Sequence, residues 1–252
     1  YTWYEGVLDS VYPTKQVAPT NEVIVKDCYK RSSLVAKQTY DEVNVVIPVF
    51  PGTNCEYDTA RVFERAGADP EVVVIKNLSA SALEESVSYI EKAIKQSQII
   101  MIPGGFSGGD EPDGSGKFIA TTFRNPVIAQ AVTDLLEKRD GLMLGICNGF
   151  QALIKLGLVP YGKITEITED SPTLTFNTIA RHQSKIVRTR VATNNSPWLA
   201  ETKVGDVYTV AISHGEGRFI ADDKTLAEMT KNGQIMTQYV DFNGNATMDI
   251  NH

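Results

Sequence analysis

The sequence predicts an α/β fold in which a parallel sheet is flanked by helices and extended by an antiparallel β addition. Two observations carry this prediction. Between residues 43 and 147, short apolar runs alternate with stretches of helical apolar periodicity, and this alternation is typical of parallel strands joined by right-handed crossovers. After about residue 160, short β-like segments separated by glycines replace the helical periodicity. A chain of 252 residues is long enough to bury one substantial core of this kind.

The parallel part is built from strands and helices that can be placed one by one. The near-continuous apolar run 43–49 predicts a first strand buried on both faces. A helix over 58–66 follows and ends at a glycine. The runs 71–75 and 98–102 predict the next two strands, and a further strand leads to Cys147. The intervening helices are predicted by apolar stripes at helical spacing: Leu83, Val87, Ile90 and Ile94 in one, and Ile128, Val132 and Leu135 in the other.

The antiparallel part is predicted from short segments with β-like composition. We expect them to extend the parallel sheet without forming a separate domain. The segments are 173–178, 185–191, 207–212, 234–240 and 246–250.

Cys147 is the candidate nucleophile. It lies in Gly-Ile-Cys-Asn-Gly at 145–149, between an apolar run and a helix-like stretch. This strand–turn–helix setting is typical of a nucleophile elbow with Cys in place of Ser. The turn needs small flanking residues and presents the sulfur at a helix N-terminus, where the helix dipole favours the reactive thiolate. A buried structural cysteine is the alternative that this motif alone leaves open.

A histidine and a glutamate downstream could complete a catalytic set. The strand-like run 207–212 leads into Ser-His-Gly-Glu-Gly at 213–217. Residues two apart in an extended segment face the same side, so His214 and Glu216 could present an imidazole backed by a carboxylate. A cysteine nucleophile requires such a base and a group that orients it. A turn with a solvated histidine and glutamate is the alternative.

A glycine-rich loop follows the strand expected at 98–102. Its sequence, Pro-Gly-Gly-Phe-Ser-Gly-Gly-Asp at 103–110, lets backbone N–H groups approach a ligand closely. An acyl-transfer cysteine needs donors for the developing oxyanion, and this loop and the N–H of Asn148 could supply them. The loop lacks the residue order of a phosphate-binding loop and of a dinucleotide fingerprint. A merely flexible loop remains an alternative.

These motifs together resemble class I (triad-type) glutamine amidotransferases. The matching sequences are Pro-Gly-Gly-Phe-Ser, Gly-Ile-Cys-Asn-Gly-Phe-Gln and Ser-His-Gly-Glu-Gly-Arg-Phe. Phe-Pro-Gly-Thr-Asn-Cys-Glu at 50–56 and Gly-Phe-Ser-Gly-Gly-Asp at 105–110 make the chain most similar to the glutaminase domain of phosphoribosylformylglycinamidine (FGAM) synthase. The resemblance covers about residues 43–250 and implies a flavodoxin-like parallel sheet with the antiparallel β addition.

The resemblance implies a role for each catalytic residue. Cys147 would attack the side-chain amide of L-glutamine, giving a glutamyl thioester and ammonia. His214 would shuttle the proton, and Glu216 would orient His214. Gly105 and Asn148 would donate backbone N–H groups to the oxyanion.

The resemblance also implies substrate contacts and a partner. Gln151 occupies the position at which related amidotransferases touch the substrate glutamine; Thr53, Asn54 and Phe106 are further binding candidates. Cys55 has no base nearby in the sequence, so a structural role is favoured for it. The ammonia would pass to a synthetase domain, expected on the same polypeptide, that binds ATP and Mg and makes FGAM from formylglycinamide ribonucleotide (FGAR).

Composition bounds the remaining possibilities. The net charge of −7 argues against a nucleic-acid-binding surface. No apolar stretch is long enough to span a bilayer, and no signal-peptide pattern is present. Three histidines and three scattered cysteines show neither zinc-ligand spacing nor a disulfide framework, so we expect no metal or other cofactor in this domain. A reducing cytoplasm is the expected location.

Residues 1–42 are expected to be a linker from a preceding synthetase domain, and 43–252 to be the glutaminase domain. The first segment has no clean periodicity and contains Pro13 and Pro19. Two other functions stay open: a Cys-elbow hydrolase of the peptidase or deglycase type, and a catalytically inactive docking module. The His-x-Glu segment and the loop at 50–56 favour the amidotransferase over the first, and the intact Cys, His and Glu set argues against the second.

Overall fold

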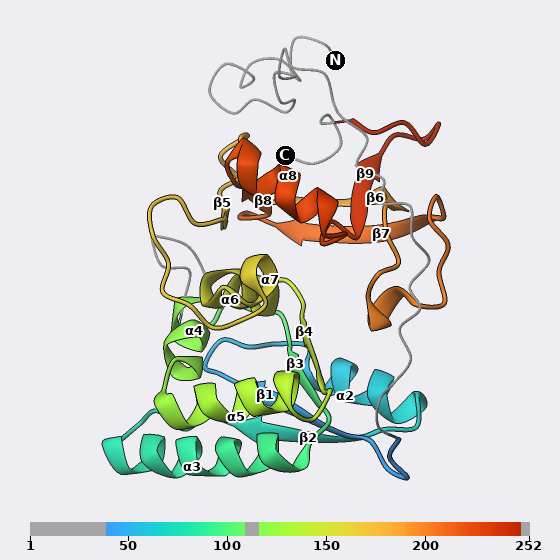
Figure 1. Cartoon of the computed structure of the whole chain (residues 1–252). Helices are drawn as coiled ribbons and strands as arrows, with labels where there is room; N and C mark the ends of the chain where they lie inside the picture. Colours follow the sequence, from blue (N-terminus) through green and yellow to red (C-terminus); the bar gives the residue numbers. More distant parts are fainter. Residues whose placement is uncertain (1–38, 109–115, 248–252) are drawn as a thin grey trace, which may run out of the picture. The chain divides into compact units, whose positions relative to one another are not determined.

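The computed structural model describes residues 39–108 and 116–247 (Figure 1). Within them the chain divides into two compact units, with the boundary between Thr173 and Leu174. We call residues 39–173 the sheet unit and residues 174–247 the β unit, and each is described by itself. Two predicted segments lie largely outside the described residues: the linker 1–42 and the strand 246–250.

The sheet unit contains four parallel strands in the order β2-β1-β3-β4. This is the start of the flavodoxin-like order, so the predicted fold class and the predicted strands are confirmed. The strands are β1 (Asn44–Val49), β2 (Asp69–Val74), β3 (Ile99–Ile102) and β4 (Leu142–Gly145). The helices are α2 (Glu56–Arg65), α3 (Ala80–Gln96), α4 (Lys117–Phe123), α5 (Pro126–Glu137), α6 (Asn148–Leu156) and α7 (Leu158–Tyr161). The short helices α4 and α7 were not predicted.

Strand β1 is buried on both faces, as expected for a central parallel strand. Val46 packs into one hydrophobic cluster with residues of α3, α5 and α6, whereas Val45 and Ile47 pack into a second cluster with Ala60 of α2. Alternate residues of the strand therefore face opposite helical layers. This alternation places α2 on one side of the sheet and α3, α5 and α6 on the other, which fixes the strand ends as the open edge for a ligand.

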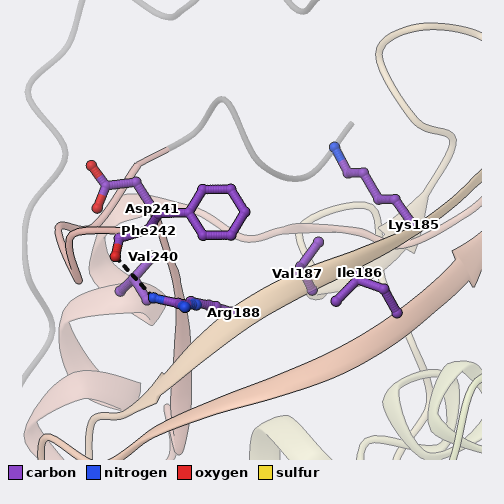
Figure 2. Close-up of a pocket in the computed structure, with 7 residues that line it drawn as sticks. All are labelled: Lys185, Ile186, Val187, Arg188, Val240, Asp241 and Phe242. Carbon is purple, nitrogen blue, oxygen red and sulfur yellow. Dashed lines mark hydrogen bonds between the residues drawn. The ribbon is translucent and has the colours of Figure 1, made fainter.

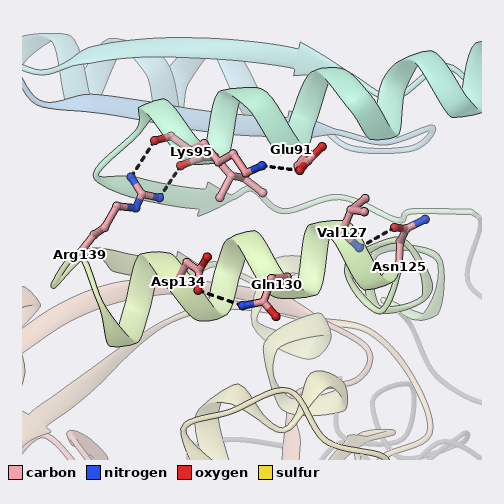
Figure 3. A network of polar contacts seen from close by, with 8 residues as sticks. Glu91, Lys95, Asn125, Val127, Gln130, Asp134 and Arg139 are labelled. Carbon is pink, nitrogen blue, oxygen red and sulfur yellow. Dashed lines mark hydrogen bonds and ion pairs between the residues drawn. The ribbon is translucent and has the colours of Figure 1, made fainter.

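Arg139 fastens the ends of two helices together (Figure 3). It follows α5, and its guanidinium donates hydrogen bonds to carbonyls of Ile94 (2.7 Å), Lys95 (3.0 Å) and Ser97 (2.9 Å) at the end of α3. The last carbonyls of a helix have no partner within it, and a cation there also complements the helix dipole. Arg139 therefore caps α3 while it holds the end of α5 against that helix.

The β unit is built from antiparallel strands that pair with one another. The central strand β6 (Gln183–Val191) lies between β7 (Val207–His214) and β9 (Thr237–Val240). The remaining elements are the pair β5 (Thr173–Thr175) and β8 (Arg218–Ile220), the 3₁₀ turn η1 (Pro197–Leu199) and helix α8 (Asp223–Lys231). Strand β8 and helix α8 were not predicted.

The expectation that these strands extend the parallel sheet is wrong. In the described ranges, none of them hydrogen-bonds to β1, β2, β3 or β4. The physical reason is that these strands find their hydrogen-bond partners among themselves: β6 pairs with β7 and β9, and β5 pairs with β8. None of the helices in residues 39–108 and 116–247 has the length and apolar character needed to cross a membrane.

Candidate active site

Cys147 occupies a sharp turn between β4 and α6, as the elbow motif predicted. Its backbone has φ 54° and ψ −109°, a combination that residues other than glycine rarely adopt. The residue is the N-cap of α6, and its side chain is exposed. The elbow thus holds a thiol in the open at a helix N-terminus, where a nucleophile can reach a substrate.

The elbow is held by close contact with β3. The N–H of Ile146 donates to the carbonyl of Ile102 (3.1 Å), and the N–H of Gly149 donates to those of Pro103 (3.1 Å) and Ile146 (2.9 Å). A Cβ on Gly149 would overlap the carbonyl oxygen of Ile102, so only glycine allows the helix to approach the strand this closely. The strained conformation of Cys147 is therefore imposed by its surroundings.

The loop after β3 runs directly beside the cysteine. A Cβ built on Gly104 would lie only 3.3 Å from the Cβ of Cys147. The order of the strands reverses between β1 and β3, and sheets of this order bind ligands at the carboxyl ends of their strands at such a reversal. The loops after β1, β3 and β4 meet at this edge.

Gly105, predicted to donate its backbone N–H to an oxyanion, pairs with the loop after β1. Two backbone hydrogen bonds, of 3.0 and 2.8 Å, join residues 52–54 to residues 104–106 and make Thr53 and Gly105 a bridge pair. In such a pair the N–H of Gly105 points away from residues 52–54. Its φ is +131°, and a Cβ there would lie 2.7 Å from the Cα of Thr53, so the position requires glycine.

The Asn148 side chain connects the glycine-rich loop to α6, which the sequence analysis missed. Asn148 is fully buried. Its Oδ1 accepts from the N–H of Ser107 (3.1 Å), and its Nδ2 donates to Oε1 of Gln151 (3.1 Å). Its backbone N–H, the predicted second oxyanion donor, lies in the first turn of α6, where N–H groups have no partner within the helix. The same residue can therefore supply a donor and fix the loop that supplies the other.

The other predicted binding residues lie in the loops at the same edge. Thr53 Oγ1 accepts from the N–H of Phe50 (3.0 Å), Asn54 Oδ1 accepts from the thiol of Cys55 (3.0 Å), and Phe106 is 48% exposed. Within the sheet unit, the structure thus brings together Cys147, Gly105, Asn148, Gln151, Thr53, Asn54 and Phe106. Their roles toward a substrate stay predictions.

His214 and Glu216 belong to the β unit. Strand β7 ends at His214, and the chain bends at Gly215 and Glu216, so the alternation of an extended segment does not reach Glu216. The Nδ1 atom of His214 lies 2.9 Å from Oδ1 of Asn177. Asn177 was not predicted, because 37 residues of sequence separate the two partners.

A hollow of about 220 Å³ on the β unit offers different chemistry (Figure 2). It is lined by β6 and by residues at the end of β9. Arg188 donates to the carbonyl of Phe242 (2.8 Å), and its guanidinium lies 5.0 Å from the centre of that ring. Burial lowers the pKa of Lys185 at the rim. No histidine or cysteine is among the residues that line the hollow, so it lacks the thiol and the imidazole that the predicted reaction uses.

The comparisons with known proteins support the family resemblance inferred from the motifs. Residues 42–252 match the family described as the CobB/CobQ-like glutamine amidotransferase domain. A protein of Methanococcus maripaludis named phosphoribosylformylglycinamidine synthase subunit PurQ is 38% identical over 196 residues, which are 77% of this chain and 65% of that protein. A protein of the same name from Aquifex aeolicus is 33% identical over 208 residues, 81% of this chain and 76% of the relative. The chain thus spans slightly less than two thirds of the Methanococcus relative.

A solved structure supports the fold. PurLQS from Thermotoga maritima aligns over 84% of this chain and 87% of its own, with a TM-score of 0.56 and 24% identity. In residues 39–108 and 116–247, no group of three or more His, Cys, Asp and Glu side chains is arranged to hold a metal ion. The family model matches residues 42–252, which is most of the chain, and agrees with the resemblance inferred from the motifs. The chain therefore belongs to the family of CobB/CobQ-like glutamine amidotransferase domains.

Proposed function

We propose that this chain is the glutaminase of a phosphoribosylformylglycinamidine synthase and releases ammonia from L-glutamine at Cys147. The observation that carries the proposal is the enforced elbow: an exposed thiol with φ 54° and ψ −109°, next to a loop that offers backbone donors. The names of the Methanococcus and Aquifex relatives support the choice of synthase.

The reaction follows from the chemistry of the residues. The sulfur of Cys147 forms a bond to the amide carbon, and the carbonyl electron pair moves to oxygen, where N–H groups of Gly105 and Asn148 stabilise the oxyanion. His214 takes the thiol proton and gives it to the leaving nitrogen, so ammonia departs and a thioester remains. Water, deprotonated by His214, then attacks the thioester, and glutamate and the free thiol are released.

Substrate positioning and charge complete the site. Gln151, with Thr53, Asn54 and Phe106 around it, would bind the glutamine. Glu216 would stabilise the imidazolium formed on His214. His214 and Glu216 belong to the β unit and Cys147 to the sheet unit.

The ammonia would be used by a synthetase that binds ATP and Mg²⁺ and converts FGAR to FGAM. The two relatives are named as synthase subunits, so the synthetase can be a separate subunit as well as a domain of the same polypeptide. A cytoplasmic location is part of the proposal, because a thiol nucleophile must stay reduced.

Affinity labelling tests the proposal. A reactive glutamine analogue, followed by peptide mass spectrometry, should modify the wild type and Cys55→Ala at Cys147 and leave Cys147→Ala unmodified. Cys55 is a matched control because it is also an exposed, free cysteine in the same unit. The labelling is carried out with the synthetase partner, FGAR and ATP present, since amidotransferases of this class are often quiet without an acceptor. Absence of labelling at Cys147 would favour the peptidase-like hydrolase or the docking module.

A double-mutant cycle tests whether Cys147 and His214 act in the same chemical step. Cys147→Ala and His214→Ala should each remove most glutamine hydrolysis, and the double variant should lose little more, because residues that act in one step are non-additive. Losses that multiply would assign the two residues to separate steps.

A further inference from the structure

His214 is held by an asparagine that no motif indicated. Its Nδ1 lies 2.9 Å from Oδ1 of Asn177. Asn177 is only 3% exposed, so this contact is protected from competing water. Both residues belong to the β unit.

The surrounding hydrogen bonds determine which way the amide of Asn177 points. Its Nδ2 donates to the carbonyls of His214 (2.8 Å) and Arg181 (3.0 Å), and the N–H of Gly217 donates to Oδ1 (3.4 Å). Reversing the amide would put its oxygen against two carbonyl oxygens and its NH₂ against an N–H. The oxygen therefore faces the imidazole.

An amide oxygen only accepts hydrogen bonds, so the proton of a neutral His214 must be on Nδ1. We infer that Asn177 is the positioning residue of His214: its Oδ1 holds the ring with Nδ1 protonated, so that in the neutral imidazole Nε2 is the nitrogen that can accept a proton. The catalytic meaning of this inference rests on the proposed glutaminase function. The tautomer itself does not.

The backbone reinforces the arrangement. The N–H of Asn177 donates to the carbonyl of Gly215 (2.8 Å), so Asn177 is bonded to the chain on the far side of His214 as well as to the ring. A Cβ on Gly217 would overlap the imidazole, so the ring packs directly on this glycine. One N–H makes one strong hydrogen bond. If Glu216 oriented His214 through Nδ1, as the resemblance implies, it would therefore compete with Asn177 for the same proton.

Nitrogen NMR of the whole chain tests the inference. Side-chain ¹H–¹⁵N spectra of a ¹⁵N-histidine-labelled protein distinguish protonated from unprotonated ring nitrogens, and His214→Ala assigns the signals. At about pH 8.5, roughly two units above the ordinary imidazole pKa, His214 should be protonated on Nδ1. In Asn177→Ala the population should shift toward protonation on Nε2, the form that an unconstrained ring favours. In Glu216→Gln it should not change.

Asn194→Ala is the matched control. Asn194 is also buried, at 4% exposure, and its side chain donates to the carbonyl of Thr202 (3.0 Å). It comes after the last residue of β6, whereas His214 pairs with the first residue of that strand. This variant should keep the wild-type tautomer of His214. If Asn177→Ala does not fold, the wild-type spectrum alone decides: protonation on Nε2 there overturns the inference. An unchanged tautomer in folded Asn177→Ala, or a change in Glu216→Gln instead, also overturns it.

Activity adds a second readout. Asn177→Ala should lower kcat for glutamine hydrolysis by about 10- to 100-fold and change KM by less than about threefold, because a misdirected base slows proton transfer and not binding. A wild-type chain that does not hydrolyse glutamine with its partner would defeat the proposed function, yet the tautomer measurement would still test Asn177. The two failures are therefore distinguishable.

Discussion

Two exposed cysteines precede helices of the parallel sheet, and their surroundings differ. Cys55 is the N-cap of α2 and Cys147 the N-cap of α6, and both have positive φ, 66° and 54°. Their ψ angles are 10° and −109°. The first pair of angles lies near the ordinary left-handed basin, whereas the second lies outside every well-populated region.

The difference shows which property sets the proposed nucleophile, Cys147, apart from Cys55. Exposure and a helix N-terminus are common to both residues, so neither property is sufficient. At Cys55 the thiol donates to its neighbour Asn54 (3.0 Å). At Cys147 the backbone is forced into a rare conformation by contacts with β3, beside loops that carry donors. Strain that the surroundings enforce is a better indicator of function than exposure.

Removal of each sulfur gives the largest expected contrast. Under the proposed function, Cys147→Ala should lower glutamine hydrolysis more than about 10³-fold, because the variant lacks the sulfur that forms the thioester, while Cys55→Ala should stay within about twofold of the wild type. Ammonia release measured with the synthetase partner, FGAR and ATP checks this. Equal losses in both variants, or retained turnover in Cys147→Ala, would break the comparison.

The sequence predicts those parts of the molecule that depend on neighbouring residues. The stripe Ile128, Val132 and Leu135 placed α5 correctly because a single helical period determines which residues are buried, and all three are fully buried. The elbow was predicted because five consecutive residues encode it. The contact between His214 and Asn177 was not, because it joins the end of β7 to the segment between β5 and β6, and no spacing in the sequence records such a long-range contact.

Substitution of the glycine that fits the elbow against β3 should have the largest effect on stability. Gly149→Ala would force the new methyl group into the carbonyl of Ile102, at a cost of about 3 kcal/mol of unfolding free energy or more. Gly67→Ala, after α2, meets no atom within 4 Å and should cost only about 1 kcal/mol for its left-handed backbone. Urea denaturation measures both values. Similar losses of unfolding free energy in the two variants would mean that the backbone at the elbow moves to accommodate the methyl group.

Each cysteine also has a neighbouring asparagine, and the two asparagines should contribute differently to the free energy of unfolding. Asn148→Ala would leave the buried N–H of Ser107 and Oε1 of Gln151 without the partner that Asn148 supplies, and should cost about 2 kcal/mol. Asn54→Ala removes an exposed side chain and should cost less than about 0.5 kcal/mol. Urea denaturation, with hydrogen exchange of the Ser107 amide, checks the difference. A small cost for Asn148→Ala would show that water replaces the lost bonds.

The smallest effect isolates the backbone strain itself. Alanine and glycine variants of each cysteine both lack sulfur, so their difference reports the cost of the conformation. At Cys147 the strain relieved by glycine, about 1–3 kcal/mol, exceeds its extra backbone entropy of about 0.5–1 kcal/mol. Cys147→Gly should therefore be more stable than Cys147→Ala by about 1 kcal/mol. At Cys55 a left-handed cost of about 1 kcal/mol nearly cancels the entropy, so glycine and alanine should agree within about 0.5 kcal/mol in thermal or urea unfolding. If glycine gained the same stability over alanine at both positions, the ψ angle of Cys147 would add no strain beyond that of Cys55. The two turns would then differ only in the residues that surround them.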